Sequence, residues 1–162
     1  MVKAPIDGES SQIEVHCGRY RPCVGSCTFC SIVAGEVPAY LVLEDALAVA
    51  FLDTRPLFPG HVLLVPRGHH ETLTDLPVEL VGPIFERAQR LARAVQRATA
   101  AAGTFVAMNN TVSQSVPHLH VHVVPRNKRD GLKGFFWPRT KYRDDAHATE
   151  VAASIRAALA SG

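Results

Sequence analysis

Residues 114–125 read QSVPHLHVHVVP, and the three histidines of this segment alternate with leucine and valine. Alternation of every second residue is typical of a β-strand, whose successive side chains point to opposite faces of the sheet. The pattern predicts a strand with His118, His120 and His122 on one face and an aliphatic core face opposite. Because imidazole titrates near neutral pH and serves as base, nucleophile or metal ligand, three histidines on one face indicate a functional site.

The same segment resembles the histidine triad motif, in which three histidines alternate with apolar residues. This motif names the HIT superfamily of nucleotide hydrolases and transferases, and the chain resembles most the zinc-containing bacterial Hint- and Fhit-like nucleotide hydrolases. The resemblance implies an α+β fold with a mostly antiparallel sheet of about five strands, one long helix and a C-terminal helix. It also implies a homodimer whose sheets join.

The composition fits one globular domain. The chain has 162 residues, of which 47% are hydrophobic and 20% are charged, and this length is enough for a core. We expect residues 1–22 to be an N-terminal extension and residues 23–162 to be a single HIT domain with a C-terminal arm and helix. The chain has no internal repeats.

Charge and hydropathy narrow the classes of partner. The formal charge of +2 does not indicate nucleic-acid binding, although a small basic bias suits anionic ligands such as nucleotides. No apolar run is long enough to cross a membrane, and the N-terminal residues lack the apolar core of a signal peptide. We therefore expect a cytoplasmic protein that binds neither nucleic acid nor membrane.

Patterns elsewhere in the chain predict the other elements. Two apolar runs separated by Asp45 and Ala46 predict a β-hairpin, and two further apolar runs predict single strands. Apolar side chains at three- and four-residue intervals predict one long amphipathic helix with a basic outer side, ended by Gly103, and an Ala-rich segment predicts a final helix. The hairpin spans 40–44 and 47–52, the strands 61–66 and 104–108, and the helices 77–101 and 144–160.

The four cysteines all fall between Cys17 and Cys30. Two intervening residues allow the thiolates of Cys27 and Cys30 to bind one tetrahedral Zn²⁺ ion, and two reduced, buried thiols are the alternative. The C-x-F-C segment is similar to that of zinc-containing HIT proteins, and this resemblance implies a structural zinc ion completed by His69 and His118. Three alternatives stay open.

The first alternative places His70 in the zinc site instead of His69. In the second, ligands from the N-terminal segment, His16, Cys17 or Cys23, join Cys27 and Cys30. In the third, no zinc is bound and His118 acts through hydrogen bonds. No carboxylate cluster indicates a requirement for Mg²⁺.

The resemblance assigns the catalytic roles. His120 attacks the α-phosphate and His122 donates to the phosphoryl oxygens, while His118 supports them. Ser115 and Gln114 assist the leaving group, and His61 packs beside the triad as the upstream histidine of the family.

The substrate-binding roles also follow from the resemblance. Asp53 accepts the ribose hydroxyls, although an aspartate before a Pro-containing loop can also serve only as a turn former. Asn109 contacts ribose or phosphate, but the loop to Gln114 is shorter than in the common family pattern, so Asn110 is an alternative. The residues expected to enclose the nucleoside, or else to be plain core, are Phe29, Ile32, Phe51 and Leu52.

The resemblance implies a hydrolase that acts on phosphoramidates or dinucleoside polyphosphates of purine nucleosides through a covalent nucleotidyl-histidine. One alternative is a nucleotidyltransferase or phosphorylase, although the uridylyltransferase type has Gln at the position of His122. The other is a nucleotide-binding regulatory module with weak turnover. A plain metal-binding β-protein would explain neither Ser115 nor Asp53. The aromatic cluster around Trp137 is expected to pack on its own domain or to reach a partner's active site.

Overall fold

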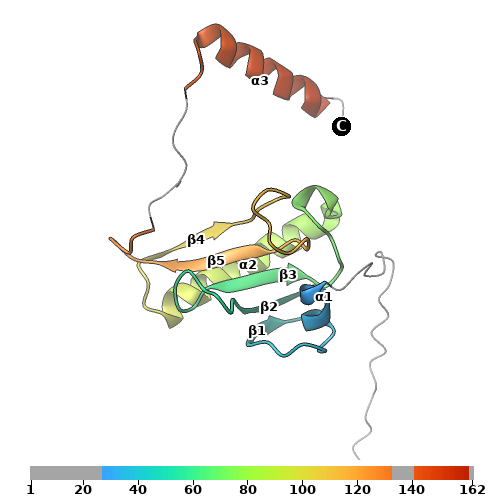
Figure 1. Cartoon of the computed structure of the whole chain (residues 1–162), viewed down its shortest axis with the longest axis vertical. Helices are drawn as coiled ribbons and strands as arrows, with labels where there is room; N and C mark the ends of the chain where they lie inside the picture. Colours follow the sequence, from blue (N-terminus) through green and yellow to red (C-terminus); the bar gives the residue numbers. More distant parts are fainter. Residues whose placement is uncertain (1–26, 133–140, 161–162) are drawn as a thin grey trace, which may run out of the picture. The chain divides into compact units, whose positions relative to one another are not determined.

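The computed structural model describes residues 27–132 and 141–160. The chain divides into two units, Met1–Asp130 and Gly131–Gly162, and each is described by itself (Figure 1). The first contains, in chain order, α1 (Thr28–Val33), β1 (Leu41–Glu44), β2 (Ala48–Leu52), β3 (Val62–Pro66), the 3₁₀ helix η1 (Leu73–Asp75), α2 (Val78–Ala98), β4 (Gly103–Ala107) and β5 (Val121–Arg126). The second contains α3 (Asp145–Ala160). The predicted α+β class is confirmed.

The sheet has five strands in the order β1-β2-β3-β5-β4, and all neighbouring strands are antiparallel. The β1–β2 hairpin closes at Asp45, whose carboxylate accepts the backbone N–H groups of Leu47 and Ala48 at 2.9 and 3.1 Å. In β5, His122 pairs with Leu63 of β3 on one side and with Ala107 of β4 on the other. The third histidine of the triad therefore lies inside the sheet.

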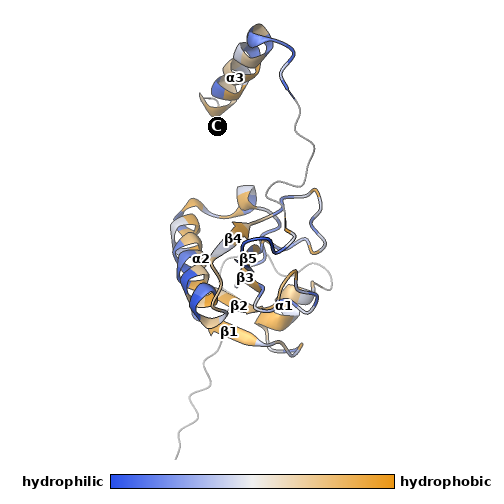
Figure 2. Ribbon diagram, turned by 90° about the vertical axis from the view of Figure 1, so that its left-hand side faces the viewer, coloured by the Kyte–Doolittle hydropathy of each residue, from blue (hydrophilic) through white to orange (hydrophobic). Residues whose placement is uncertain are grey.

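Helix α2 covers one face of the sheet because its apolar residues recur every three or four positions. Figure 2 shows hydrophilic residues along the outer side of α2 and hydrophobic residues on the strands beside it. The buried residues of this core are Ala48, Ala50, Val62, Leu64, Leu76, Ile84, Ala88, Leu91, Val95, Leu119, Val121 and Val123. The opposite face buries Phe29, Val49, Phe51, Leu63 and Val65. The aliphatic residues of the triad segment thus face α2, as the alternation predicts.

Two sequence predictions need correction, and one helix was not predicted. The strand β5 begins only at Val121, so His118 and His120 precede it, although the alternation of faces continues through them. Helix α2 ends at Ala98 rather than running on toward Gly103, because Ala100 adopts the left-handed conformation with φ 52°. The short helix α1 was not predicted, since six residues are too few to show a helical period.

Some predictions fall outside the described residues. These are the N-terminal extension, the alternative zinc ligands His16, Cys17 and Cys23, and the aromatic cluster around Trp137. Within the described part of the chain, no helix combines the length and the apolar character that crossing a membrane requires.

Candidate active site and metal centre

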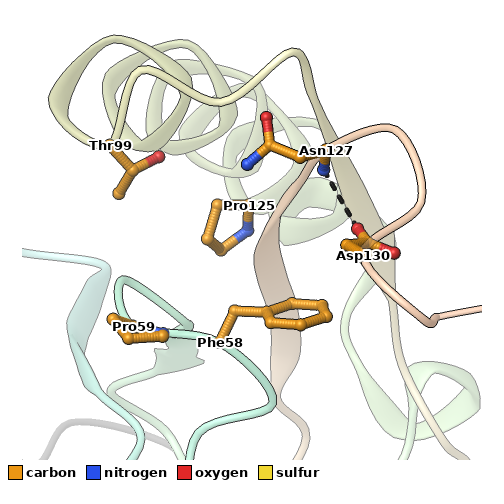
Figure 3. Close-up of a pocket in the computed structure, with 6 residues that line it drawn as sticks. All are labelled: Phe58, Pro59, Thr99, Pro125, Asn127 and Asp130. Carbon is orange, nitrogen blue, oxygen red and sulfur yellow. Dashed lines mark hydrogen bonds between the residues drawn. The ribbon is translucent and has the colours of Figure 1, made fainter.

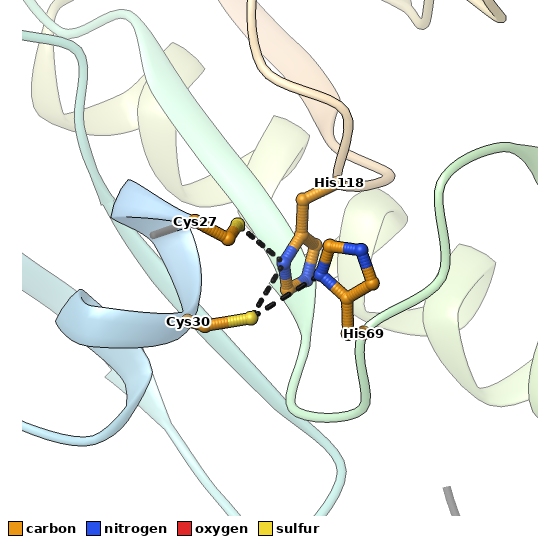
Figure 4. A group of neighbouring side chains, drawn as sticks. All are labelled: Cys27, Cys30, His69 and His118. Carbon is orange, nitrogen blue, oxygen red and sulfur yellow. Dashed lines mark hydrogen bonds between the residues drawn. The ribbon is translucent and has the colours of Figure 1, made fainter. Parts of the chain in front are cut away.

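Two cysteines and two histidines from three separate segments form one cluster (Figure 4). Cys27 caps the N-terminus of α1 and Cys30 lies in it, while His69 follows β3 and His118 precedes β5. Their donor atoms all lie within 4.8 Å of one another. The structure brings His69, rather than His70, to these cysteines.

The donor distances fit a tetrahedral zinc ion. Ideal Zn–S and Zn–N bonds of about 2.3 and 2.0–2.1 Å place a sulfur and a nitrogen ligand about 3.6 Å apart. The Sγ atoms of Cys27 and Cys30 lie 3.5 Å from the Nδ1 atom of His118, and Sγ of Cys30 lies 3.3 Å from Nδ1 of His69. These three distances are close to those expected between ligands of one zinc ion.

His118 is prepared to act as a ligand through Nδ1. Its Nε2 atom lies 3.0 Å from the carbonyl oxygen of Pro66, and because a carbonyl only accepts, the proton must be on Nε2. Nδ1 then carries the lone pair that faces the cysteines. Burial lowers the pKa of His118 to about 4, so the ring is in its neutral, metal-binding form at neutral pH.

A larger hollow lies beside the cluster, with a cavity volume of about 640 Å³. Phe29 joins the two sites, because its ring centroid lies 6.0 Å from that of His118 and 5.2 Å from that of His120. The residues that line the hollow are Thr28, Phe29, Ile32, Val37, Pro38, Ala39, Phe51, Leu52, Asp53, Thr54, Arg55, Leu63, Ser115, Val116, His120 and His122. Most of the lining residues are apolar, and the histidines and Ser115 contribute polar groups, as is usual for a small-molecule site.

The orientation of His120 leaves one ring nitrogen able to act as a nucleophile. Its Nδ1 atom lies 2.7 Å from the carbonyl oxygen of His118 and must therefore carry the proton. In the neutral ring, Nε2 then keeps its lone pair. His120 lines the hollow although only 3% of its surface is exposed, so this nitrogen is shielded from bulk water.

His61 orients His122 through a chain of hydrogen bonds. The backbone N–H of Leu57 donates to Nδ1 of His61 at 3.3 Å, and Nε2 of His61 lies 2.9 Å from Nδ1 of His122. Since Nδ1 of His61 accepts, its Nε2–H donates to His122, which keeps a proton on its own Nε2. Asp53 Oδ2 lies 3.4 Å from Nδ1 of His61 and can form an ion pair with this ring when the ring is protonated.

Acidification is expected to destabilise the fold through His122. Burial and the neighbouring His120 and His61 lower the pKa of His122 from 6.5 to about 4, so between these values the unfolded chain binds a proton that the folded chain does not. The resulting stability is complete above pH 6.5 and is lost as the pH falls toward 4. Because part of the ring is exposed to water, we expect a loss of about 1 kcal/mol.

Thermal unfolding of the wild type and of His122→Asn, whose amide does not titrate, measures this effect. Between about pH 7 and pH 4.5 the unfolding temperature of the wild type should fall by roughly 3 °C more than that of the variant. Any release of metal at low pH lowers both unfolding temperatures and cancels in the difference. Equal falls in the two proteins would show that the protonation of His122 does not contribute.

The other predicted substrate residues divide into two groups. Phe29, Ile32, Phe51, Leu52 and Asp53 all line the hollow. Phe29 and Ile32 share one face of α1 because they are three residues apart in a helix. The structure thus brings the predicted nucleoside contacts together with His120 and His122.

Gln114 and the two asparagines do not line the hollow. The Gln114 amide accepts the N–H of Thr111 at 2.7 Å and donates to the carbonyl of Glu71 at 2.6 Å. Asn109 donates to the Ser113 carbonyl at 3.2 Å, and in the same loop Asn110 accepts the N–H of Leu73 at 2.8 Å. These amides hold the loop that presents Ser115.

A smaller hollow of about 190 Å³ lies on the first unit. Its lining is Phe58, Pro59, Thr99, Pro125, Asn127 and Asp130 (Figure 3). It contains no histidine, cysteine or hydroxyl nucleophile other than Thr99, whose hydroxyl donates to the Val95 carbonyl at 2.8 Å. His120, His122 and Ser115 line the larger hollow, which is therefore the candidate active site.

One charged residue of the larger hollow was missed from the sequence. Arg55 lies two residues after Asp53 and lines the hollow beside it. The Asp-Thr-Arg-Pro segment indicates only a turn, and nothing in its composition distinguishes Arg55 from the other surface arginines.

Comparisons with known proteins agree with this geometry. The model of the HIT domain family matches residues 34–129. An adenylylsulfatase of Arabidopsis thaliana is 31% identical over 142 residues, which cover 83% of this chain and 70% of the plant protein. An adenosine 5′-monophosphoramidase of Saccharomyces cerevisiae is 36% identical over 117 residues, which cover 70% of each chain.

A solved structure is similar over most of its length. The crystal structure of a zinc-bound histidine triad family protein from Mycobacterium smegmatis has 37% sequence identity and a TM-score of 0.64, and the match covers 83% of this chain and 97% of that one. The HIT domain match spans more than half of the present chain and includes Asp53, His61 and the three triad histidines. As its motif predicts, the chain belongs to the HIT family.

Proposed function

We propose that this protein hydrolyses nucleoside monophosphate derivatives at the α-phosphate through a covalent nucleotidyl-histidine. The observation that carries the proposal is the 2.7 Å hydrogen bond from His120 Nδ1 to the His118 carbonyl. It leaves the lone pair on Nε2 of a ring that lines the hollow. The similarity to an adenylylsulfatase and to an adenosine 5′-monophosphoramidase supports a phosphosulfate or phosphoramidate of adenosine as substrate.

In the first step, Nε2 of His120 attacks the α-phosphorus and forms a P–N bond, as expected of a neutral imidazole nucleophile. The bond between phosphorus and the leaving group breaks, and its electron pair goes to the leaving atom. An amine leaving group takes up one proton from solvent through the Ser115 hydroxyl and leaves as ammonia, whereas sulfate leaves as the anion. The Nε2–H of His122, fixed by the 2.9 Å bond to His61, stabilises the phosphoryl oxygens.

In the second step, water attacks the same phosphorus and the P–N bond to His120 breaks. The electron pair returns to Nε2, a proton passes to solvent, and the nucleoside monophosphate leaves. Asp53 accepts a ribose hydroxyl, while Phe29 and Ile32 of α1 contact the base. We assign Gln114 and Asn109 to holding the Ser115 loop.

The proposal includes a structural zinc ion held by Cys27, Cys30, His69 and His118. A site with four protein ligands leaves no position for water or substrate, so zinc would supply cross-linking rather than Lewis-acid chemistry. Fixing the His118 ring also fixes its carbonyl, which orients the nucleophile.

A turnover assay distinguishes this function from its two rivals. We expect adenosine 5′-phosphoramidate and adenosine 5′-phosphosulfate to yield adenosine 5′-monophosphate, with or without added inorganic phosphate. Formation of adenosine 5′-diphosphate when phosphate is present would indicate a phosphorylase. Tight nucleotide binding with negligible turnover of both substrates would indicate a binding module.

The proposal also includes a homodimer and a cytoplasmic location. The strand β4 is at an edge of the sheet, and its Val106 is 41% exposed. An edge strand has backbone groups that can pair with a second copy. This arrangement supports dimerisation through joined sheets.

A further inference from the structure

We propose that Arg55 makes the site prefer nucleotides that carry a second phosphate, on the 2′ or 3′ oxygen of the ribose. The inference rests on the proposed function, which places the nucleoside against Asp53. It narrows the substrate class of the proposed function, because it specifies a phosphate on the ribose and not only the bond that is cleaved.

The hollow has one acidic and one basic residue in its lining. These are Asp53 and Arg55, and no other lysine or arginine lines it. The α-phosphate of the substrate is contacted by His122 and Ser115, which donate hydrogen bonds without needing Arg55. The guanidinium is thus available for a further anion.

Arg55 is exposed and is not committed to the fold. Among residues 27–132 and 141–160, its guanidinium makes no hydrogen bond or ion pair, whereas Arg67 and Arg87 pair with Glu44 and Asp45 at 2.8 Å. Its planar group matches a phosphate through two parallel hydrogen bonds.

Asp53 and Arg55 lie close together in the lining. The Oδ1 atom of Asp53 accepts the backbone N–H of Arg55 at 2.8 Å, and both residues line the hollow. Since Asp53 accepts a ribose hydroxyl in the proposed function, a phosphate on the neighbouring ribose oxygen would pair with the Arg55 guanidinium.

Equilibrium binding of four nucleotides tests the inference without depending on turnover. The probes are adenosine 5′-monophosphate, its 2′,5′- and 3′,5′-bisphosphate relatives, and adenosine 5′-diphosphate, which places the added charge at the other end. Calorimetry measures the dissociation constants. At least one of the two bisphosphates should bind the wild type about tenfold more tightly than adenosine 5′-monophosphate. Arg55→Gln should remove this gain, while Arg90→Gln, an exposed arginine of α2, should retain it.

The remaining outcomes separate the two proposals. Bisphosphates that bind no better than the monophosphate, or a gain that persists in Arg55→Gln, would overturn the role of Arg55 and leave the hydrolase proposal intact. An equal gain for the diphosphate that is lost in Arg55→Gln would also overturn it, since Arg55 would then contact the leaving group. Failure of every nucleotide to bind would instead contradict the proposed function.

Discussion

Replacement of His120 by Asn should lower kcat for adenosine 5′-phosphoramidate by about 10⁴-fold or more. The asparagine amide can still donate to the His118 carbonyl, which accepts from His120 at 2.7 Å, but it has no nitrogen lone pair that can attack phosphorus. The loss should therefore appear in the chemical step. Release of adenosine 5′-monophosphate measures turnover, and calorimetry with the same nucleotide should show an affinity within about threefold of the wild type.

His147→Asn provides the matched control, because His147 lies in α3 and outside the HIT domain match. This variant should keep the wild-type kcat. If His120→Asn retained more than about a tenth of the activity, His120 could not be the nucleophile, since a lost covalent route costs far more than tenfold.

Replacement of Cys30 by Ser should remove the metal and much of the stability. The Cys30 sulfur lies within 3.5 Å of the Nδ1 atoms of His69 and His118, whereas a serine hydroxyl binds zinc poorly. We expect zinc in protein purified without chelator to fall from about one equivalent to less than 0.1, and the unfolding temperature to fall by at least about 10 °C. Elemental analysis and thermal unfolding measure the two quantities.

Three further variants identify the ligands. Cys23→Ser and His70→Asn should retain about one equivalent of zinc, because the structure places His69 at the cluster. Loss of zinc from His70→Asn with retention in His69→Asn would reverse that assignment, and loss from Cys23→Ser would place a ligand in the N-terminal segment. Wild-type protein that contains far less than one equivalent of zinc would contradict the zinc site altogether.

The fold could be predicted from the sequence where a residue pattern reports directly on burial. The alternation through Leu119, Val121 and Val123 correctly predicts which residues pack beneath α2. It does not show where the hydrogen bonds of β5 begin, because side chains can alternate in an extended chain before it pairs with a neighbour. His118 and His120 therefore keep their predicted face but lie outside the strand.

The site was less predictable where the backbone conformation determines which side chains line the hollow. Thr111 and Ser113 have positive φ angles of 67° and 60°, which their residue types do not signal. This backbone directs the Gln114 amide to Thr111 and Glu71 and not into the hollow. Arg55 was missed for a related reason, since only the folded chain shows which surface arginine borders the site.

The most direct test of the central claim is to trap the covalent intermediate. Wild-type protein mixed with adenosine 5′-phosphoramidate is quenched in alkali within milliseconds, and its peptides are mapped by mass spectrometry. We predict one adenylyl group, attached to Nε2 of His120. An adenylyl group on His122 or on any other residue, or turnover with no adenylated peptide at any quench time, would contradict the account.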